Sequence, residues 1–275
     1  MGKYLSFSLN TTKFLGKEDL VRFLFSEIEK LPKQLVPTKY EINKYKNKGK
    51  FSFDKLEEVI AQVPATYLYE GYVQVYKIKD IFNLRYIWTK CPEGMYENNR
   101  YMAINRVDFY LACNDLDVYE NKEYFNILRE MWLNLCIKLD ALYGQCSIDD
   151  NSLGSGYKGW GFGKCIPRLH WQTYFNNDYK EVLNIKKEIN SDRCELEYLD
   201  NGAFILTLND HPVNLIKRTD LEREVVKNLG KEYFWDEKDK WSKPSGGYKM
   251  PKLDLSEVVY KPSKHIVLKV PYDSP

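Results

Sequence analysis

The stretch from Lys122 to Gly144, KEYFNILREMWLNLCIKLDALYG, carries the clearest structural signal in this chain. Its apolar side chains recur every three or four residues, which is the spacing of one face of a helix. They are Phe125, Leu128, Trp132, Leu135, Cys136, Leu139 and Leu142. Since glycine commonly follows the last turn of a helix, we predict a helix from about Lys122 to Tyr143 that ends at Gly144.

Three segments before this helix are rich in the aromatic and β-branched residues that suit a pleated, half-buried surface. They are Gly71–Ile78, Asn83–Thr89 and Tyr101–Ala112. The connection Cys91–Asn99 is short and favours a hairpin over a crossover helix. We therefore predict an antiparallel sheet with the long helix packed across it.

Helix and strand signals also precede these segments. Lys3–Leu9 alternates as an opening strand, and Lys17–Leu31 has the apolar spacing of a helix that Pro32 stops. The lysine-rich stretch that follows, through Lys50, indicates an extended, solvated connection.

After the long helix, local capping and turn signals dominate. We expect Asp178 to cap a short helix through Ile185. Glu195–Leu199 and Ala203–Leu208 flank Asp200-Asn201-Gly202, and Asn-Gly is a hairpin signal. Thr219 and Glu222 have capping-box spacing, which predicts a helix over about Asp220–Leu229.

The fold class that follows is α+β, with a mainly antiparallel sheet covered by helices. The chain has 275 residues, 44% of them hydrophobic and 15% aromatic, so it can bury a large core. We predict a single domain over residues 1–275, and two similar-sized packed halves, 1–150 and 151–275, are the alternative.

Charge and cysteine content restrict the partners and the compartment. The 41 basic and 39 acidic residues are too balanced to provide a general field for nucleic acid or anionic membrane. The sequence has no apolar run of membrane-spanning length, and we expect no secretion by a standard signal. The six cysteines form no C-x-x-C pair, so we expect reduced core cysteines in a cytoplasmic protein.

A glycine-rich stretch, Gly154-Ser-Gly156-Tyr-Lys-Gly159, matches the letters of the dinucleotide-binding fingerprint. The fingerprint requires a strand before it and a helix after it. Here the stretch is preceded by Asp149-Asp150-Asn151, which does not indicate a strand, and is followed by Trp160-Gly-Phe162-Gly, which does not indicate a helix. We expect a loop that presents Tyr157, Trp160 and Phe162 to a protein partner, because aromatic side chains dominate interface energetics. Packing of these rings over a sheet edge is the alternative.

The sequence predicts no catalytic residue, no metal ligand and no cofactor. The histidines lack metal-ligand spacing, and we expect His170 to be a structural residue in a strand. Asp149 and Asp150 indicate a turn after the long helix, while Glu195 and Glu197 fit a solvated strand face. We therefore expect a protein that is not an enzyme.

Lysines alternate with aromatic residues over Lys39–Lys55, a pattern that could follow a nucleic-acid backbone while stacking bases. Glu41 and Asp54 dilute the charge and arginine is missing from the stretch. A solvated loop is the favoured interpretation, and nucleic-acid binding is not expected.

The segment Cys165-Ile-Pro-Arg-Leu-His-Trp171-Gln-Thr-Tyr174-Phe is followed by the hairpin through Gly202-Ala-Phe-Ile-Leu-Thr-Leu and by Asp210-His-Pro212. This order, with the preceding strand and long helix and the closing helix, resembles the bacterial immunity proteins of polymorphic toxin systems. It resembles especially the C-terminal half of the fifty-second immunity type and of related type VI secretion immunity proteins. The resemblance covers roughly residues 100–230.

The resemblance implies a cytosolic α+β protein that binds and blocks a cognate toxin, often a nuclease, in bacterial competition. The partner would be held by surface complementarity, and we expect Tyr157, Trp160, Phe162, Asp149 and Asp150 to contribute. The alternative is a phage-related defence or counter-defence protein that binds a nucleotide signal or a host effector through the same loop.

Overall fold

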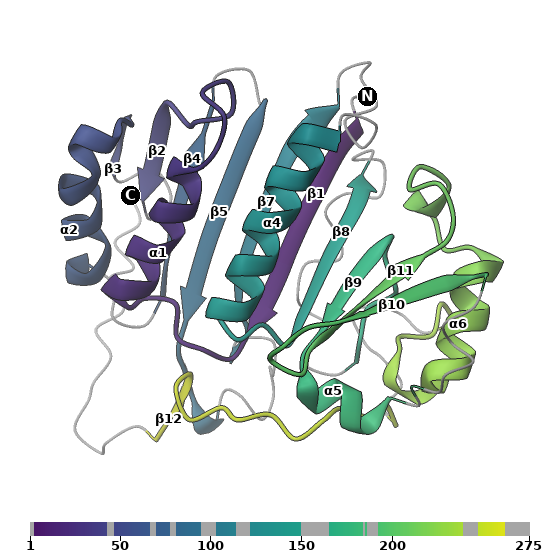
Figure 1. Ribbon diagram of the computed structural model, residues 1–275. Coiled ribbons are helices and arrows are strands. Elements are labelled where there is room, and N and C mark those ends of the chain that lie inside the picture. The colour runs from purple at the N-terminus through teal and green to yellow at the C-terminus, as the bar shows by residue number, and fades with distance from the viewer. Residues whose placement is uncertain are drawn as a thin grey trace.

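The computed structural model of the chain describes residues 3–42, 47–66, 70–77, 81–94, 103–113, 122–149, 165–183, 185, 192–238 and 247–261. Within these ranges, ten strands form one antiparallel sheet in the order β10-β11-β9-β8-β1-β7-β5-β4-β2-β3 (Figure 1). The strands are β1 Lys3–Thr11, β2 Lys39–Ile42, β3 Asn47–Lys50, β4 Glu70–Tyr76, β5 Phe82–Thr89, β7 Asn105–Cys113, β8 Tyr143–Asp149, β9 Gln172–Phe175, β10 Cys194–Tyr198 and β11 Phe204–Leu208. The fold class is α+β, as predicted.

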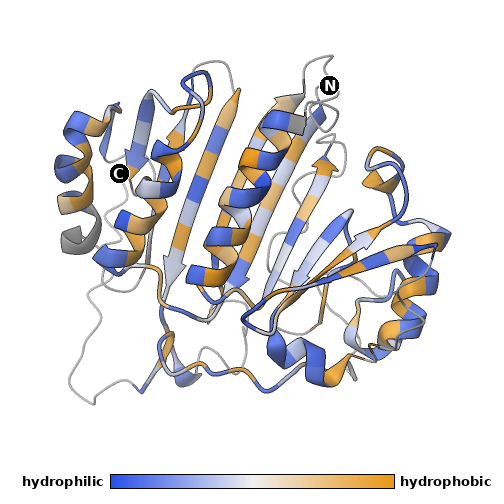
Figure 2. Cartoon of the chain, viewed as in Figure 1, coloured by the Kyte–Doolittle hydropathy of each residue, from blue (hydrophilic) through white to orange (hydrophobic). Residues whose placement is uncertain are grey.

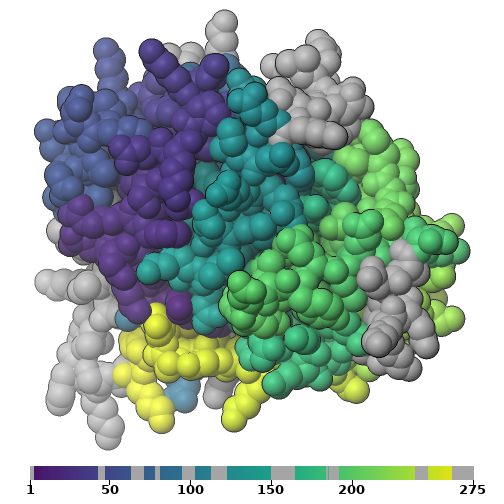
Figure 3. Space-filling model, viewed as in Figure 1, coloured from purple at the N-terminus to yellow at the C-terminus, as the bar shows by residue number. Residues whose placement is uncertain are grey.

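In the part of the chain that the structure describes, three helices cover one face of the sheet, and α4 lies over the central strands β7 and β1 (Figure 1). They are α1 Glu18–Glu29, α2 Leu56–Thr66 and α4 Lys122–Lys138. Figure 2 shows that β5 alternates between hydrophilic and hydrophobic residues, and its alternate residues Phe82, Leu84, Tyr86 and Trp88 are buried in the core. In Figure 3 the side chains of α1 and α4 cover the middle of this face.

Aromatic side chains join α4 to the central strands. Phe7 of β1 stacks on Phe109 of β7 at 4.9 Å between ring centroids, and Trp132 of α4 lies 5.9 Å from Phe7. The indole Nε1 of Trp132 donates to the backbone oxygen of Ser8 at 2.9 Å. The helix therefore packs on the sheet as predicted, and the one polar atom of the Trp132 ring has a hydrogen-bond partner.

The end of α4 differs from the prediction. The helix ends at Lys138, Asp140 takes a positive φ of 50°, and Tyr143 already begins β8. Gly144 is a strand residue against which α4 packs directly. A Cβ added at this position would lie 3.0 Å from Trp132 Cζ2 and 3.1 Å from Cys136 Sγ. This glycine provides close approach between helix and strand rather than a helix stop.

A second apolar cluster packs around β8, β9 and β11. Phe175 stacks on Phe204 at 5.2 Å and meets the ring of Tyr143 edge-on at 5.7 Å. The same cluster contains Tyr179 and Leu229. Its helical elements are α5 Asn177–Val182, η5 Asn214–Ile216, α6 Asp220–Gly230 and η6 Lys231–Tyr233.

Several local predictions are confirmed. β5 and β7 pair directly, and β10 and β11 form the hairpin, with Gly202 at a φ of 84°. The Thr219 side chain accepts from the backbone N–H of Glu222 and caps α6. Five cysteines are buried in the core of the part of the chain that the structure describes.

Other local predictions were wrong. Asn176, not Asp178, caps α5, because its side chain accepts from the backbone N–H of Tyr179. The lysine-rich connection contains the edge hairpin β2–β3, since Lys39 to Ile42 pair with 47–50. His170 lies before β9 rather than inside a strand.

Strands from residues 1–150 and from 151–275 share one sheet, because β8 pairs with β9. Near the end of the described chain, β12 Val259–Tyr260 pairs in parallel with β6 Cys91–Pro92. The single-domain organisation stays a prediction. None of the described helices is long and apolar enough to cross a membrane.

Candidate functional site

The face of the sheet opposite α4 carries polar side chains along its central strands. Because side chains alternate along a strand, β1 turns Leu5, Phe7 and Leu9 to the helices and Ser6 and Ser8 to the other side. We call this side the groove face.

Strand register continues the polar pattern across neighbouring strands. Ser8 lies opposite Asp108 of β7 on one side and Gln145 of β8 on the other. Asp108 is in turn opposite Arg85 of β5, and Arg85 is opposite Gln74 of β4. One row of five polar residues therefore crosses five strands.

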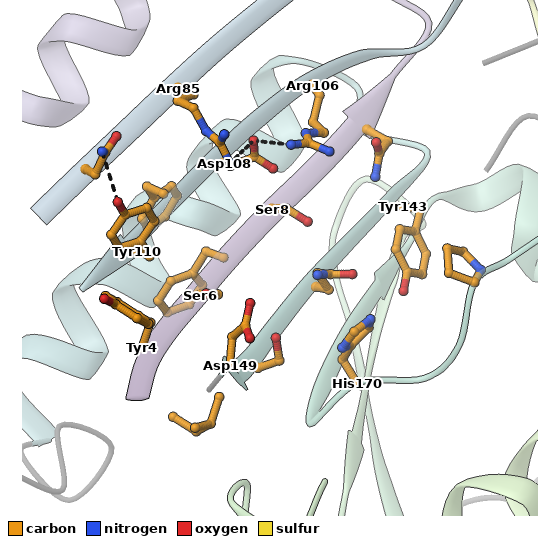
Figure 4. Close-up of a pocket in the computed structure, with 18 of the residues that line it drawn as sticks. Tyr4, Ser6, Ser8, Arg85, Arg106, Asp108, Tyr110, Tyr143, Asp149 and His170 are labelled. Carbon is orange, nitrogen blue, oxygen red and sulfur yellow. Dashed lines mark hydrogen bonds and ion pairs between the residues drawn. The ribbon is translucent and has the colours of Figure 1, made fainter. Parts of the chain in front are cut away.

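Two further rows flank the first. One contains Asn83, Tyr110, Ser6 and Ser147, and the other contains Arg106, Asn10 and Tyr143. Figure 4 shows how the labelled members of the three rows lie beside one another. The rows together form a patterned polar surface.

A groove of about 370 Å³ lies over these rows. The serines of β1 are small compared with the side chains on the adjacent strands, which leaves room above them. One wall comes from another part of the chain, the loop before β9 together with η5. Its residues are Pro167, Arg168, His170, Leu215 and Ile216.

The floor contains a cluster of two arginines around one carboxylate (Figure 4). Asp108 Oδ2 lies 2.7 Å from Arg106 Nη2 and 3.5 Å from Arg85 Nη2. Arg106 Nε is buried and has no hydrogen-bond partner among the described residues. The three side chains, which we call the groove triad, together carry one excess positive charge.

The wall is held by a second arginine–carboxylate cluster, which is buried. Glu222 of α6 accepts from Arg168 Nη2 at 2.5 Å, and its other oxygen lies 3.1 Å from Arg218 Nε. Leu169 N–H also donates to Glu222, at 3.2 Å. Burial raises the pKa of the Glu222 carboxyl, against the opposing effect of both guanidinium groups. We call this cluster the wall triad.

The two arginines of the wall triad also donate hydrogen bonds to backbone carbonyl oxygens. Arg168 donates to the oxygens of Leu215 and Ile216, each at 3.1 Å. Arg218 donates to the oxygens of Trp235 at 2.9 Å and of Pro167 at 2.7 Å. These bonds tie the loop before β9 to η5 and to the segment after η6, so the wall has a defined position.

His170 lies in the wall and is buried. Its backbone N–H donates to Thr173 Oγ1 at 2.9 Å. Burial, together with the nearby positive charges of Arg168 and Arg218, holds the pKa of His170 well below its usual range. The imidazole is therefore neutral at neutral pH.

The predicted partner-binding residues have different outcomes. Asp149 is the last residue of β8, opposite Tyr4, and lines the groove rather than forming a turn after a helix (Figure 4). The other four, Asp150, Tyr157, Trp160 and Phe162, lie outside the described residues. Their role in binding a partner stays a prediction.

The two glutamates of β10 lie away from the groove. Glu197 forms an ion pair with Arg129 of α4, on the helical side of the sheet. Glu195 is exposed, as expected for a solvated strand residue. In the described ranges, no group of three or more histidine, cysteine or acidic residues could hold a metal ion.

Sequence reasoning missed the groove triad. Polar residues at alternate positions, Ser6-x-Ser8 in β1 and Arg106-x-Asp108 in β7, were a usable signal for a half-polar sheet face. Arg85 lies on a third strand. Only the pairing of β5 with β7 brings it to Asp108.

By its fold, the chain is an α+β protein built on a large antiparallel sheet with a polar groove on one side. No family model matches it, and no curated protein matches it. A solved structure with a similar fold is the Pseudomonas aeruginosa T6SS protein PA0821, with a TM-score of 0.56 and 10% sequence identity. The match covers 84% of this chain and 74% of that chain, and at this identity it concerns the fold alone.

Proposed function

We propose that this protein is a non-catalytic, immunity-like protein that binds and neutralises a cognate bacterial toxin. The observation that carries the proposal is the polar groove, whose floor is built from five paired strands. The resemblance over residues 100–230 and the similar fold of a T6SS protein support a role in bacterial competition.

The groove suits recognition because its side chains stand on a rigid scaffold. β1, β5, β7 and β8 are each hydrogen-bonded to strands on both sides, so their side chains are positioned before a partner arrives. Such preorganisation lowers the entropic cost of association. The volume of about 370 Å³ lies near the lower end of the range for binding pockets.

The chemistry of the floor favours charge recognition. Asp108 contacts two guanidinium groups through the same oxygen. A carboxylate between two guanidinium groups holds them in position and leaves their other N–H donors for a partner. We therefore propose inhibition by occlusion of the toxin, without a reaction at the groove.

Co-expression tests the proposal. The toxin encoded beside this gene is induced in a bacterial host with and without the protein, and growth and co-purification are measured. We expect restored growth and a stable complex that buries more than about 1,000 Å². The proposal would be contradicted if growth were not restored and if no adjacent gene product formed a complex with the protein.

A nucleotide panel in a thermal-shift assay tests the alternative of a signal-binding protein. A ligand at one hundred times its dissociation constant adds about 2.7 kcal/mol of stability. We expect no shift. A nucleotide that raises the melting temperature would favour the alternative over toxin binding.

A further inference from the structure

The groove triad has hydrogen-bonding capacity beyond its internal contacts. Each guanidinium has five N–H donors, and the contacts to Asp108 engage Nη2 of Arg85 and Nη2 of Arg106. Arg106 Nε is buried and unpaired among the described residues, although a buried donor is costly to leave unpaired. An acceptor that enters the groove can engage the Nη1 groups of both arginines, which take no part in these contacts to Asp108.

The sign of the charge points to an anionic acceptor. Two arginines share one aspartate, so the cluster attracts a single negative charge. The guanidinium group matches the geometry of a carboxylate, because two parallel N–H donors can meet its two oxygens. The match is geometric as well as electrostatic.

The surroundings favour a carboxylate over a phosphate. The triad carries one excess positive charge, which a singly charged carboxylate balances, whereas a doubly charged phosphate would leave excess negative charge in a groove that Asp149 also lines. The remaining central positions, including Ser6, Ser8 and Gln145, are neutral hydrogen-bonding groups. Such groups suit the amides of a polypeptide.

We infer that the groove binds one acidic side chain of a protein partner, an aspartate or glutamate held between Arg85 and Arg106. This inference rests on the proposed function in one respect, because it names the part of the toxin that enters the groove. A groove of about 370 Å³ admits the tip of a loop rather than a helix about 10–12 Å wide. The toxin therefore presents its acidic residue on an exposed loop.

The first experiment uses a probe that needs no toxin. The blocked peptides acetyl-Ser-Asp-Ser-amide and acetyl-Ser-Asn-Ser-amide are titrated into the full-length protein, and backbone amide shifts are followed by NMR. We expect saturable shifts in β1, β5 and β7 with the aspartate peptide in the millimolar range, and at least fivefold weaker binding of the asparagine peptide.

Substitutions locate the peptide site. Arg106→Gln and Arg85→Gln should each weaken the aspartate peptide several-fold. Arg193→Gln is the matched control, because Arg193 forms an exposed ion pair with Glu224 outside the groove. Equal binding of both peptides, no saturable shift, tighter binding of inorganic phosphate, or an unchanged Arg106→Gln variant would each overturn the inference.

The second experiment uses the toxin complex. The double variant Arg85→Gln/Arg106→Gln should bind the toxin at least tenfold more weakly than the wild type, whereas Arg193→Gln should bind equally well. Circular dichroism and thermal melting establish that the variants are folded.

The two experiments separate two kinds of failure. If wild-type protein binds no toxin, the proposed function fails while the peptide titration still decides the groove. If the double variant binds the toxin as tightly as the wild type, the inference fails and the proposed function stands.

Discussion

Two clusters of the same composition, an acid between two arginines, have different environments in this protein. In the wall triad the side chains of Arg168, Glu222 and Arg218 are 2%, 0% and 9% exposed. In the groove triad those of Arg85, Asp108 and Arg106 are 37%, 14% and 18% exposed. Residue types alone do not separate a structural ion cluster from a recognition site, whereas burial and connectivity do.

The wall triad joins segments that lie far apart in the sequence. Its arginines bind backbone carbonyls of the loop before β9, of η5 and of Trp235, and Glu222 belongs to α6. The groove triad lies on β5 and β7, which are already joined by a backbone ladder. The wall triad therefore maintains the structure, and the groove triad remains available to a partner.

The largest expected effect is a loss of folding stability when Glu222 is replaced. Replacing it with alanine leaves Arg168 and Arg218 buried without their counter-charge, which should cost about 3–5 kcal/mol of unfolding free energy. Urea denaturation measures the loss. Asp108→Ala in the groove triad is the matched control, and equal losses in the two variants would show that burial does not distinguish the clusters.

The next largest expected effect is a dependence of folding stability on pH. It arises from His170, whose pKa the positive charges of Arg168 and Arg218 help to lower. Because the folded pKa of His170 is lowered, the unfolded chain binds more protons below about pH 6.5, and stability should fall as the pH drops through that value. The slope is at most about 1.4 kcal/mol per pH unit. Above about pH 6.5 this contribution is constant.

Urea denaturation at several pH values between neutral and mildly acidic tests this effect. His170→Gln should lose the slope that His170 causes. Glu222 also titrates in acid, but it is present in both proteins, so the difference between their slopes isolates the histidine. Identical slopes would contradict a buried, neutral imidazole.

The smallest effect is expected within the groove triad. A double-mutant cycle on Arg85→Gln and Asp108→Asn should give a coupling of about 0.2–1 kcal/mol, because the pair is 3.5 Å apart and partly exposed. The coupling should decrease in high salt, since mobile ions screen exposed charges. A larger coupling that does not depend on salt would show that this pair behaves as a buried ion pair, like those of the wall triad.

Much of the fold could be predicted from local patterns. The helical spacing around Trp132, the Asn201-Gly202 turn and the Thr219 cap depend on neighbouring residues, and the structure confirms all three. Gly144 shows the limit of such rules. Glycine after an apolar helical stripe indicates a helix end, but here it lies in β8 because Trp132 and Cys136 pack against it.

The candidate site could be predicted only in part. Asp149 was identified from sequence and lines the groove, while the arginines of the groove triad were not. Alternation along β1 and β7 indicated which residues share a face, but not which strands are neighbours. Arg85 reaches Asp108 across 23 positions of chain because β5 pairs with β7.

The amino-acid sequence by itself determined the α+β class, the antiparallel pairing of successive strands and the local caps and turns. These follow from short-range periodicity and backbone preferences. Only the tertiary structure decided that β1 lies between β7 and β8, that α6 contributes Glu222 to the wall, and that one arginine cluster is buried and the other lines a groove. Burial and long-range register depend on contacts between distant segments, which no local pattern encodes.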